Sequence, residues 1–302
     1  MSRNNVIMYL VRNTKRDLSN LELSLKSLDT YFNNKYHYPV ILFHENLTVE
    51  QQVLIKSNTA SELIFEQIEF QLPSFLDPES IPETVHINGF GFSVGYRHMC
   101  RFFSSEVYAH PVLDSFEYCW RLDTDSFLRG PVDYDVFEFM RGNNCVYGYI
   151  DSGVDTGDND ELRQITNDYI KSHGLKYDGW DGSAYGTNFE ISQIKFWKSG
   201  ACADYLSYID KSGGIYKHRW GDHIIHFIAV SLFLSENQLH HFTDIAYQHQ
   251  DVLYNHTVDV SILTQSINKL KSLILRTILK SSTLLKRKSK RYKAFRDNKN
   301  GI

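Results

Sequence analysis

An alternation of short apolar runs and helical patterns at the start of the chain constrains its fold most strongly. Residues 6–11, 40–43 and 63–65 are apolar runs of strand length, whereas residues 18–32 and 49–57 place apolar side chains at helical spacing. This strand–helix–strand order predicts a parallel α/β sheet. Because ligands of such sheets bind beyond the carboxyl ends of the strands, we expect functional residues where the strands end.

The rest of the chain continues this pattern less regularly. We predict helices at 96–108, 133–140 and 222–234, a mostly helical stretch at 191–208, and strands at 116–122, 145–150 and 240–245. Residues 151–160 are rich in Gly, Asp and Ser and are predicted to form a loop. The character of the sequence changes near Asp259, so we expect one main domain, residues 1–259, followed by a tail, residues 260–302.

The charges of the chain are divided between these two parts. Residues 261–302 contain 8 Lys and 4 Arg against one acid, Asp297, which gives +11. The first 260 residues hold the remaining 20 bases and 35 acids, or −15. An acidic body argues against nucleic-acid binding and suits a protein that holds cations.

The tail combines this basic charge with spaced apolar residues. Apolar side chains recur through residues 262–285 with bases between them, and residues 286–299 form a basic block. This pattern is typical of an amphipathic helix on an anionic membrane, followed by an electrostatic anchor. A solvated tail, or a helix packed on the acidic surface of the main domain, would account for the same pattern.

Neither the cysteines nor the hydropathy indicates an extracellular protein. The chain has four cysteines and no Cys-x-x-Cys pair, so we expect buried thiols rather than a zinc site. The first apolar run is too short to span a membrane and has no cleavage-site pattern after it. No other stretch approaches 18 apolar residues, so we expect a cytoplasmic protein that the tail could hold at a membrane.

Two carboxylates at the end of the predicted strand 116–122 are the first candidate site. Asp123 and Asp125, separated by one residue, would place acidic oxygens at the carboxyl edge of the sheet. A divalent cation relieves the repulsion between such carboxylates, and hard oxygen ligands suit Mn²⁺ or Mg²⁺. The cation in turn neutralises a diphosphate leaving group. Taken alone, so short a motif is more simply explained as a solvated acidic turn.

Longer runs surround this pair and carry a family resemblance. They are Tyr118-Cys119-Trp120-Arg121-Leu122-Asp123-Thr124-Asp125, Tyr96-Arg97-His98-Met99-Cys100-Arg101-Phe102, Asn188-Phe189-Glu190-Ile191, Arg219-Trp220-Gly221-Asp222 and Asp244-Ile245-Ala246-Tyr247-Gln248-His249. In order and spacing, residues 6–251 resemble glycosyltransferase family 15, the fungal α-1,2-mannosyltransferases. The resemblance implies a single GT-A-like, Rossmann-like α/β domain, with a mixed central sheet flanked by helices. It also implies a retaining enzyme that uses Mn²⁺ and moves mannose, or a related hexose, from GDP-mannose to a glycan or glycoprotein hydroxyl.

The resemblance assigns the metal ligands residue by residue. Asp123-Thr124-Asp125 occupies the place of the family's usual Glu-Pro-Asp, so Asp123 is a shorter carboxylate than the family's metal-binding glutamate. His249 falls on the family's metal-binding histidine, and a neutral imidazole is a suitable Mn²⁺ ligand beside carboxylates.

The resemblance also implies roles at the reacting centre. Glu190 falls on the family's candidate nucleophile, which either forms a covalent glycosyl-enzyme or stabilises charge in a front-side displacement. Tyr96 matches a tyrosine near the donor phosphate and the reacting centre, and Arg12 an arginine that contacts the nucleotide or phosphates. Asp222 matches an acidic residue that binds acceptor hydroxyls or orients the site. Without the resemblance, Glu190 would be interpreted as a carboxylate at a helix start and Asp222 as a helix N-cap.

Three further arginines of these runs, Arg97, Arg101 and Arg121, are expected to pair with nearby acids. Two departures from the family pattern limit what it implies. The fungal enzymes carry an N-terminal anchor and stem, whereas this chain begins at the first strand, so we expect the tail to replace the anchor. Residues 151–186 are short and divergent, and such loops often set acceptor specificity.

Two other functions fit the acidic residues less well. A binding module without turnover has little need for two aspartates, Glu190, Asp222 and His249 together. A glycosidase also uses paired carboxylates, but it does not explain two of them at a strand end.

Overall fold

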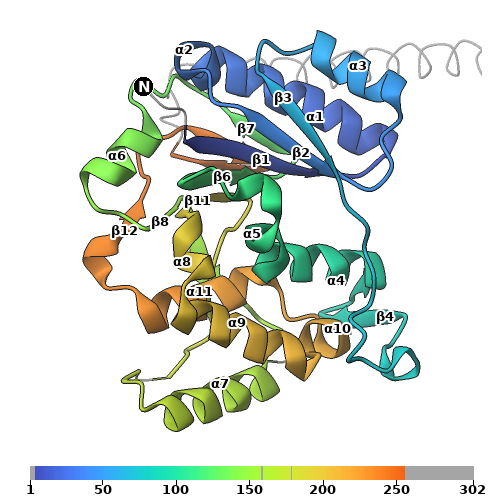
Figure 1. The fold of residues 1–302 in the computed structure, drawn as a ribbon, viewed down its shortest axis with the longest axis vertical. Coiled ribbons are helices and arrows are strands. Elements are labelled where there is room, and N and C mark those ends of the chain that lie inside the picture. The colour runs from blue at the N-terminus through green and yellow to red at the C-terminus, as the bar shows by residue number, and fades with distance from the viewer. Residues whose placement is uncertain (1–3, 158, 178, 256–302) are drawn as a thin grey trace, which may run out of the picture. The chain divides into compact units, whose positions relative to one another are not determined.

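A seven-stranded mixed sheet runs through the middle of the protein, as a computed structural model that describes residues 4–157, 159–177 and 179–255 shows (Figure 1). The order of the strands is β12 (Leu239–His241), β8 (Tyr147–Tyr149), β11 (Phe189–Gln193), β6 (Tyr118–Leu122), β1 (Asn5–Val11), β2 (Val40–His44) and β3 (Leu63–Gln67). All neighbouring strands are parallel except where β11 pairs with β6 and β8. The start of β11 therefore lies beside the carboxyl end of β6.

Alternate residues of the strands divide the core into two clusters, one on each face of the sheet. On β1, Val6 and Met8 enter one cluster, whereas Ile7 and Tyr9 enter the other, and all four are fully buried. Full burial of a large apolar side chain contributes about 1.5–3 kcal/mol, so both faces of the sheet stabilise the fold strongly. Helices cover both faces, as expected of an α/β protein (Figure 1).

The face that receives Ile7 and Tyr9 is covered by few helices. These are α1 (Lys15–Leu28), which continues through the π-helical turn Asp29–Asn33 into α2 (Asn34–Tyr36), and α6 (Val136–Gly142). The hydroxyl of Thr14 caps α1 by accepting from the Asp17 amide at 3.1 Å. Helix α3 (Val49–Ser57) lies beside α1 and begins at a capping box between Thr48 and Gln51.

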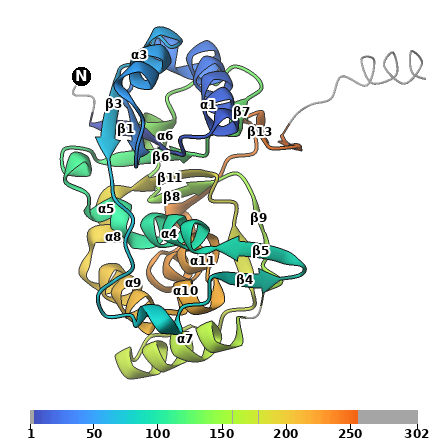
Figure 2. The same ribbon diagram turned by 90° about the vertical axis from the view of Figure 1, so that its right-hand side faces the viewer.

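The opposite face carries most of the helices (Figures 1 and 2). They are α4 (Val94–Arg101), the π-helical turn Phe102–Glu106, α5 (Val107–Ala109), α8 (Ile194–Lys198), α9 (Gly200–Ser212), α10 (Gly214–His218) and α11 (Asp222–Phe233). Helix α7 (Asp160–His173) packs on α9 as an outer layer. Short 3₁₀ turns occur at Pro78–Ser80, Pro111–Leu113 and Glu236–Gln238.

Among the described residues there are also three small sheets, and Figure 2 shows the hairpin of β4 (Thr84–Ile87) and β5 (Phe90–Ser93) beside α4, away from the main sheet. The first contains β14 (Val252–Tyr254), β13 (Tyr247–His249) and β7 (Ser126–Leu128), the second is the hairpin β4–β5, and the third pairs β9 (Ser152–Val154) with β10 (Ser183–Tyr185). The first of these sheets returns the end of the described chain to the segment that follows Asp125.

Two expectations about these elements are only partly right. Residues 191–208 are mostly helical, as expected, but their first three residues belong to the antiparallel strand β11 (Phe189–Gln193), and α8 starts at the next residue. Strand and helix join without a polar linker, so the apolar pattern looked continuous. Residues 151–160 also contain the short strand β9 and the first residue of α7, not only a loop.

The four cysteines are free thiols and all are buried, as expected. Within the described residues, no helix is both long enough and apolar enough to cross a bilayer. The chain divides into one unit spanning Met1–His256 and a second spanning Thr257–Ile302. The tail predicted at 260–302, with its amphipathic helix, lies outside the described residues.

Candidate active site

The turn that carries the two aspartates is fixed at both ends. It follows β6, whose five residues are all buried, and leads directly into β7. The backbone amide of Ser126 donates to the Asp123 carbonyl at 3.0 Å, and the Asp123 amide donates to the Ser126 hydroxyl at 3.2 Å. That hydroxyl also contacts the Tyr247 hydroxyl, at 2.6 Å. The backbone of the acidic turn is therefore held by neighbours on both sides.

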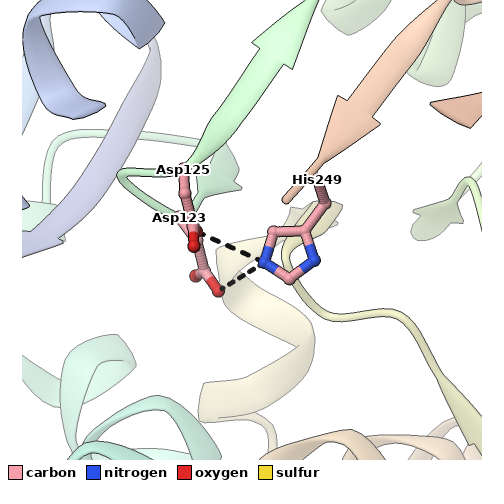
Figure 3. Close-up of side chains that lie close together, drawn as sticks. All are labelled: Asp123, Asp125 and His249. Atoms are coloured by element: carbon pink, nitrogen blue, oxygen red, sulfur yellow. Dashed lines mark ion pairs between the residues drawn. The ribbon is translucent and has the colours of Figure 1, made fainter. Parts of the chain in front are cut away.

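Strand pairing brings His249 to this turn. β13 is antiparallel to β7 and places His249 opposite Ser126. The Nε2 atom of His249 lies 3.3 Å from Asp125 Oδ1 and 3.8 Å from Asp123 Oδ2 (Figure 3). One potential ligand atom from each of the three residues lies within 4.8 Å of the others. The side chains are 34%, 21% and 19% exposed for Asp123, Asp125 and His249, so a small ion can reach them.

The electrostatics of the three residues differ in ways that follow from their neighbours. Partial burial raises the pKa of Asp123, despite the Arg121 guanidinium nearby. Burial also opposes ionisation of Asp125, but hydrogen bonding to His249 leaves the pKa of Asp125 below its ordinary value. Burial would lower the pKa of His249, yet its bond to Asp125 and the charge of Asp123 raise it. The raised pKa of His249 and the lowered pKa of Asp125 thus share one cause, the close contact between the two side chains.

Arg121 joins the acidic turn to the start of α11. Its Nη1 donates to Asp222 Oδ2 at 2.5 Å, and its Nη2 donates to Asp123 Oδ1 at 3.4 Å. The guanidinium lies 3.5 Å from the centre of the Phe103 ring, and its Nε has no hydrogen-bond partner. Arg121 is thus a buried cation between two acids that the sequence assigned to different roles.

Asp222 is buried at the first turn of α11. It accepts from Arg121 and also from the Thr187 hydroxyl, at 2.7 Å. Burial opposes its ionisation, but the Arg121 charge holds the pKa of Asp222 well below its ordinary value. It is the first residue of the helix, and Gly221 takes the N-cap position without a side-chain bond, so the alternative interpretation as an N-cap is wrong.

Tyr96 on α4 belongs to a polar cluster near Asp222. The Arg219 Nη2 donates to the Tyr96 hydroxyl at 3.1 Å, and the Arg219 guanidinium lies 4.3 Å from the centre of the Phe92 ring. Asp155, which follows β9, accepts from His223 Nε2 at 2.8 Å and lies 3.5 Å from Arg219 Nη1. Burial raises the pKa of Tyr96, so its hydroxyl is a neutral hydrogen-bonding group.

Glu190 is fully buried on β11, opposite Arg121 in the pairing with β6. Its Oε1 accepts from the Tyr108 hydroxyl at 2.6 Å, and its Oε2 accepts from the Tyr147 hydroxyl at 2.9 Å. Oε2 also lies 2.7 Å from His226 Nδ1. Burial opposes ionisation, but His226, and to a lesser extent Arg121, leave the pKa of Glu190 below its ordinary value. The alternative of a carboxylate at a helix start is wrong, because Glu190 lies within a strand.

Arg12 stands apart from these groups. It directly follows β1 at the carboxyl edge of the sheet, and its side chain is 76% exposed. Its guanidinium pairs with Asp17 at 3.0 Å, which leaves most of it open to solvent. This position is accessible to a ligand, but within the described residues Arg12 pairs with Asp17 and not with the acidic turn.

The structure therefore gathers most of the predicted residues into two neighbouring groups. Asp123, Asp125 and His249 form the first group, a cluster that could hold a metal ion. Arg121 connects this cluster to the second group, which contains Asp222 and Tyr96. The pairing of arginines with acids is confirmed for Arg121 and for Arg101, which binds Asp210 at 2.7 Å.

The same expectation is wrong for Arg97, which donates to backbone carbonyls, including those of Ser93 and Glu83. A buried guanidinium can satisfy its donors with carbonyls as well as with carboxylates.

Sequence reasoning missed several polar partners of these residues. They are Tyr108, Tyr147, Asp155, Thr187, Arg219, His223 and His226. A signal existed for His226, which lies four residues after Asp222 in the largely apolar helix α11, so the two share a helix face. No local signal marks Tyr108 or Tyr147, because buried tyrosines are common in cores this aromatic.

Known proteins resemble this chain in sequence. A family model described as glycolipid 2-alpha-mannosyltransferase matches residues 1–269. The probable mannosyltransferase KTR3 of Saccharomyces cerevisiae is 34% identical over 270 residues, which cover 82% of this chain and 66% of the relative. The alpha-1,2 mannosyltransferase KTR1 of the same yeast is 32% identical over 272 residues, 80% of this chain and 67% of the relative. The chain thus spans about two thirds of the length of both relatives.

Solved structures resemble it in fold. Core-mannan synthase A of Aspergillus fumigatus, in its Mn/GDP form, matches with a TM-score of 0.76 at 26% identity, covering 84% of this chain and 76% of that one. The mannosyltransferase Ktr4p of S. cerevisiae in complex with GDP matches with a TM-score of 0.75 at 27% identity, covering 83% and 72%.

Proposed function

The chain belongs to the glycolipid 2-alpha-mannosyltransferase family, and we propose that it transfers mannose from GDP-mannose to a hydroxyl of a glycan or glycoprotein acceptor. The GT-A-like fold and the glycosyltransferase class expected from the sequence are confirmed. The observation that carries the proposed reaction is the cluster of Asp123, Asp125 and His249 at the carboxyl end of β6. We further propose that the enzyme forms an α-1,2 linkage and retains the anomeric configuration. The names of the relatives support the α-1,2 linkage.

We assign the metal site to this cluster. Two carboxylates and one imidazole within 4.8 Å are a donor set that suits Mn²⁺, with Mg²⁺ as the harder alternative. The solved relative in an Mn/GDP form supports Mn²⁺ and a guanine nucleotide. When bound, the ion neutralises the charge that develops on the diphosphate leaving group. The protein residues hold the ligand atoms in place through the β7–β13 pairing.

The remaining site residues are proposed to act on the donor and acceptor. Arg12 is exposed at the edge of the sheet, where it can contact the nucleotide or phosphates. Tyr96, with Arg219 bound to its hydroxyl, contributes a neutral donor near the phosphate and the reacting centre. Asp222 orients the site or binds acceptor hydroxyls, and its bond to Arg121 links it to Asp123.

We propose that Glu190 stabilises the positive charge that develops at the anomeric carbon. Its carboxylate is enclosed by Tyr108, Tyr147 and His226, and no part of its side chain is exposed in this arrangement. Three hydrogen-bond donors reduce the reactivity of a carboxylate, so this enclosure favours charge stabilisation over nucleophilic attack.

A panel of GDP- and UDP-sugars with Mn²⁺, scored for donor hydrolysis and for transfer to mannosides, tests the proposal. We expect transfer from GDP-mannose. No turnover with any donor would instead support a non-catalytic sugar-nucleotide or glycan binding module.

A Glu190→Ala variant separates binding from chemistry in the same assay. We expect it to lose transfer while it still binds GDP and Mn²⁺, because Glu190 contacts neither the metal cluster nor Arg12. Transfer at the wild-type rate would refute the role of Glu190.

We also propose that the basic tail, residues 260–302, binds an anionic membrane surface. The support is the sequence pattern alone, because these residues lie outside the described part of the chain. The location in the cytoplasm and the division of the chain into a catalytic domain, 1–259, and this tail likewise stay predictions.

A further inference from the structure

His226 is a buried ionisable group in direct contact with Glu190. It lies on α11 among apolar neighbours, and neither its ring nor the Glu190 side chain is exposed. The Trp197 ring stacks on the imidazole at 4.2 Å between ring centres. The histidine is therefore fixed between β11 and the helices of one face.

Both ring nitrogens of His226 face oxygen atoms. Nε2 lies 3.3 Å from the Ser104 carbonyl oxygen, and Nδ1 lies 2.7 Å from Glu190 Oε2. A carbonyl oxygen only accepts hydrogen bonds, so Nε2 must carry the proton of that bond. A neutral imidazole would then have a bare Nδ1 facing a carboxylate, and the short Nδ1–Oε2 contact therefore requires one additional proton.

The neighbours of the pair decide on which atom that proton resides. The ionisable groups that face the pair from surrounding elements include Tyr147 of β8, Tyr108 of α5, Cys119 and Arg121 of β6, Tyr185 of β10, and Asp222 of α11. Both tyrosine hydroxyls donate to Glu190, which favours its ionised form. Arg121 and Asp222 neutralise one another through a 2.5 Å contact. Arg121 also favours the Glu190 charge, but His226 is the group in direct hydrogen-bond contact with Glu190 that can carry a positive charge. Because an unpaired buried charge is costly, the additional proton resides on the imidazole.

We propose that His226 is a positioning residue: its imidazolium, held between the Ser104 carbonyl and Glu190, keeps Glu190 an ordered carboxylate behind the reacting centre. The expected loss of kcat rests on the proposed mannosyl transfer, whereas the number of protons on the His226 ring does not depend on it. His226 does not touch the donor. It acts through Glu190, whose fixed negative charge stabilises the developing positive charge at the anomeric carbon.

The proton count is tested without any assay of activity. The full-length protein is labelled with ¹⁵N-histidine, and the His226 signals are assigned by their absence in His226→Asn. We expect both ring nitrogens of His226 to carry protons at neutral pH, and a Glu190→Gln variant to convert His226 to the neutral form. A bare Nδ1 in the wild-type protein would overturn the proposal.

The kinetic consequence is tested by His226→Asn, because the asparagine amide reproduces the donor at Nδ1 without the charge. We expect kcat to fall roughly 10- to 100-fold, the loss of a charge-assisted hydrogen bond, with little change in KM for GDP-mannose. The acid limb of the kcat–pH profile should move to higher pH, since Glu190 loses the cation that favours its ionisation. The exposed His173→Asn on α7 is the matched control.

Tyr108→Phe provides a second route if His226→Asn does not fold. It removes one donor to Glu190 and should move the acid limb in the same direction by a smaller amount. Folding is checked by thermal unfolding and by GDP binding with Mn²⁺. Folded variants with unchanged kcat and pH profile would overturn the positioning role. If wild-type protein transfers no sugar, the proposed function fails, and the histidine spectrum still decides the proton count.

Discussion

Asp125 and His249 form the closest contact within the candidate metal site, at 3.3 Å, and they come from segments more than 120 residues apart. Asp123 is more exposed and is shared with Arg121. The three residues therefore contribute unequally, although they offer the same kind of ligand atoms. Asp125 and His249 depend on each other, whereas Asp123 also depends on the buried Arg121–Asp222 pair.

Removal of one of these ligands should abolish most of the metal-dependent activity. We expect Asp125→Asn and His249→Ala to reduce kcat/KM at fixed Mn²⁺ by about 100-fold or more, because stabilisation of the diphosphate charge is worth several kcal/mol. Isothermal titration with Mn²⁺ and GDP should show weakened metal binding in both. Asp168→Asn, at an exposed carboxylate on α7, is the control. Equal Mn²⁺ affinity in all four proteins would contradict the assignment.

Arg12 offers a test of the donor-binding edge. Its side chain is 76% exposed and bonded only to Asp17 in the contacts described, so its removal should disturb the fold little. We expect Arg12→Ala to raise KM for GDP-mannose roughly tenfold with kcat nearly unchanged, the loss of one charge-assisted contact to the ligand. The matched control is Arg16→Ala, at an exposed arginine on α1. A lower kcat at constant KM would place Arg12 elsewhere in the mechanism.

The sequence predicted the residues that line the end of a strand better than it predicted their partners. Asp123 and Asp125 follow an apolar run, which locates them at the sheet edge from local pattern alone. The enclosure of Glu190 depends instead on three separate elements that supply Tyr108, Tyr147 and His226. Such long-range contacts leave no periodic signal in the chain.

At the scale of elements, the antiparallel strand β11 is the feature that builds the site. It brings Glu190 opposite Arg121, two residues before Asp123, because its start lies beside the end of β6.

The first five elements were predicted well, since strands and helices alternate there with polar residues between them. The last three residues of β11 were assigned to the helical stretch because α8 follows them directly. The small hairpins were missed because strands of three or four residues carry too little alternation.

The junction of α9 and α10 allows the Trp220-Gly221-Asp222 segment to pack closely. A Cβ atom at Gly214 would lie 2.1 to 2.3 Å from three carbon atoms of the Trp220 ring, which is fully buried. We expect Gly214→Ala to lower the free energy of unfolding by about 1–3 kcal/mol through overpacking, measured by urea denaturation. Gly200→Ala is the matched control, because its Cβ would meet nothing within 4 Å. Equal stability of the two variants would show that Trp220 moves aside freely.

At the scale of the whole molecule, the two parts of the chain carry opposite net charges, and this difference bears on membrane binding. The first 260 residues carry −15 and the remainder +11. An acidic domain is repelled by an anionic membrane, whereas a polybasic segment is attracted by about 1 kcal/mol per Lys or Arg near the surface. The tail can therefore act as an anchor only if its attraction to the membrane exceeds the repulsion of the domain. Because both forces are electrostatic, the binding depends on the salt concentration.

Flotation of full-length protein with liposomes decides whether the tail is such an anchor. We expect binding to vesicles that contain phosphatidylserine, weaker binding to neutral vesicles, and loss of binding as salt rises, because screening removes the electrostatic attraction. A chain that ends near Asp259 should not float, and a full-length variant with the bases of residues 286–299 changed to Gln should float much less. The Gln variant keeps the apolar residues, so it separates charge from hydrophobic insertion. Equal flotation of full-length and shortened protein would contradict the anchor, and flotation of the Gln variant at the full-length level would assign the binding to residues 262–285 instead.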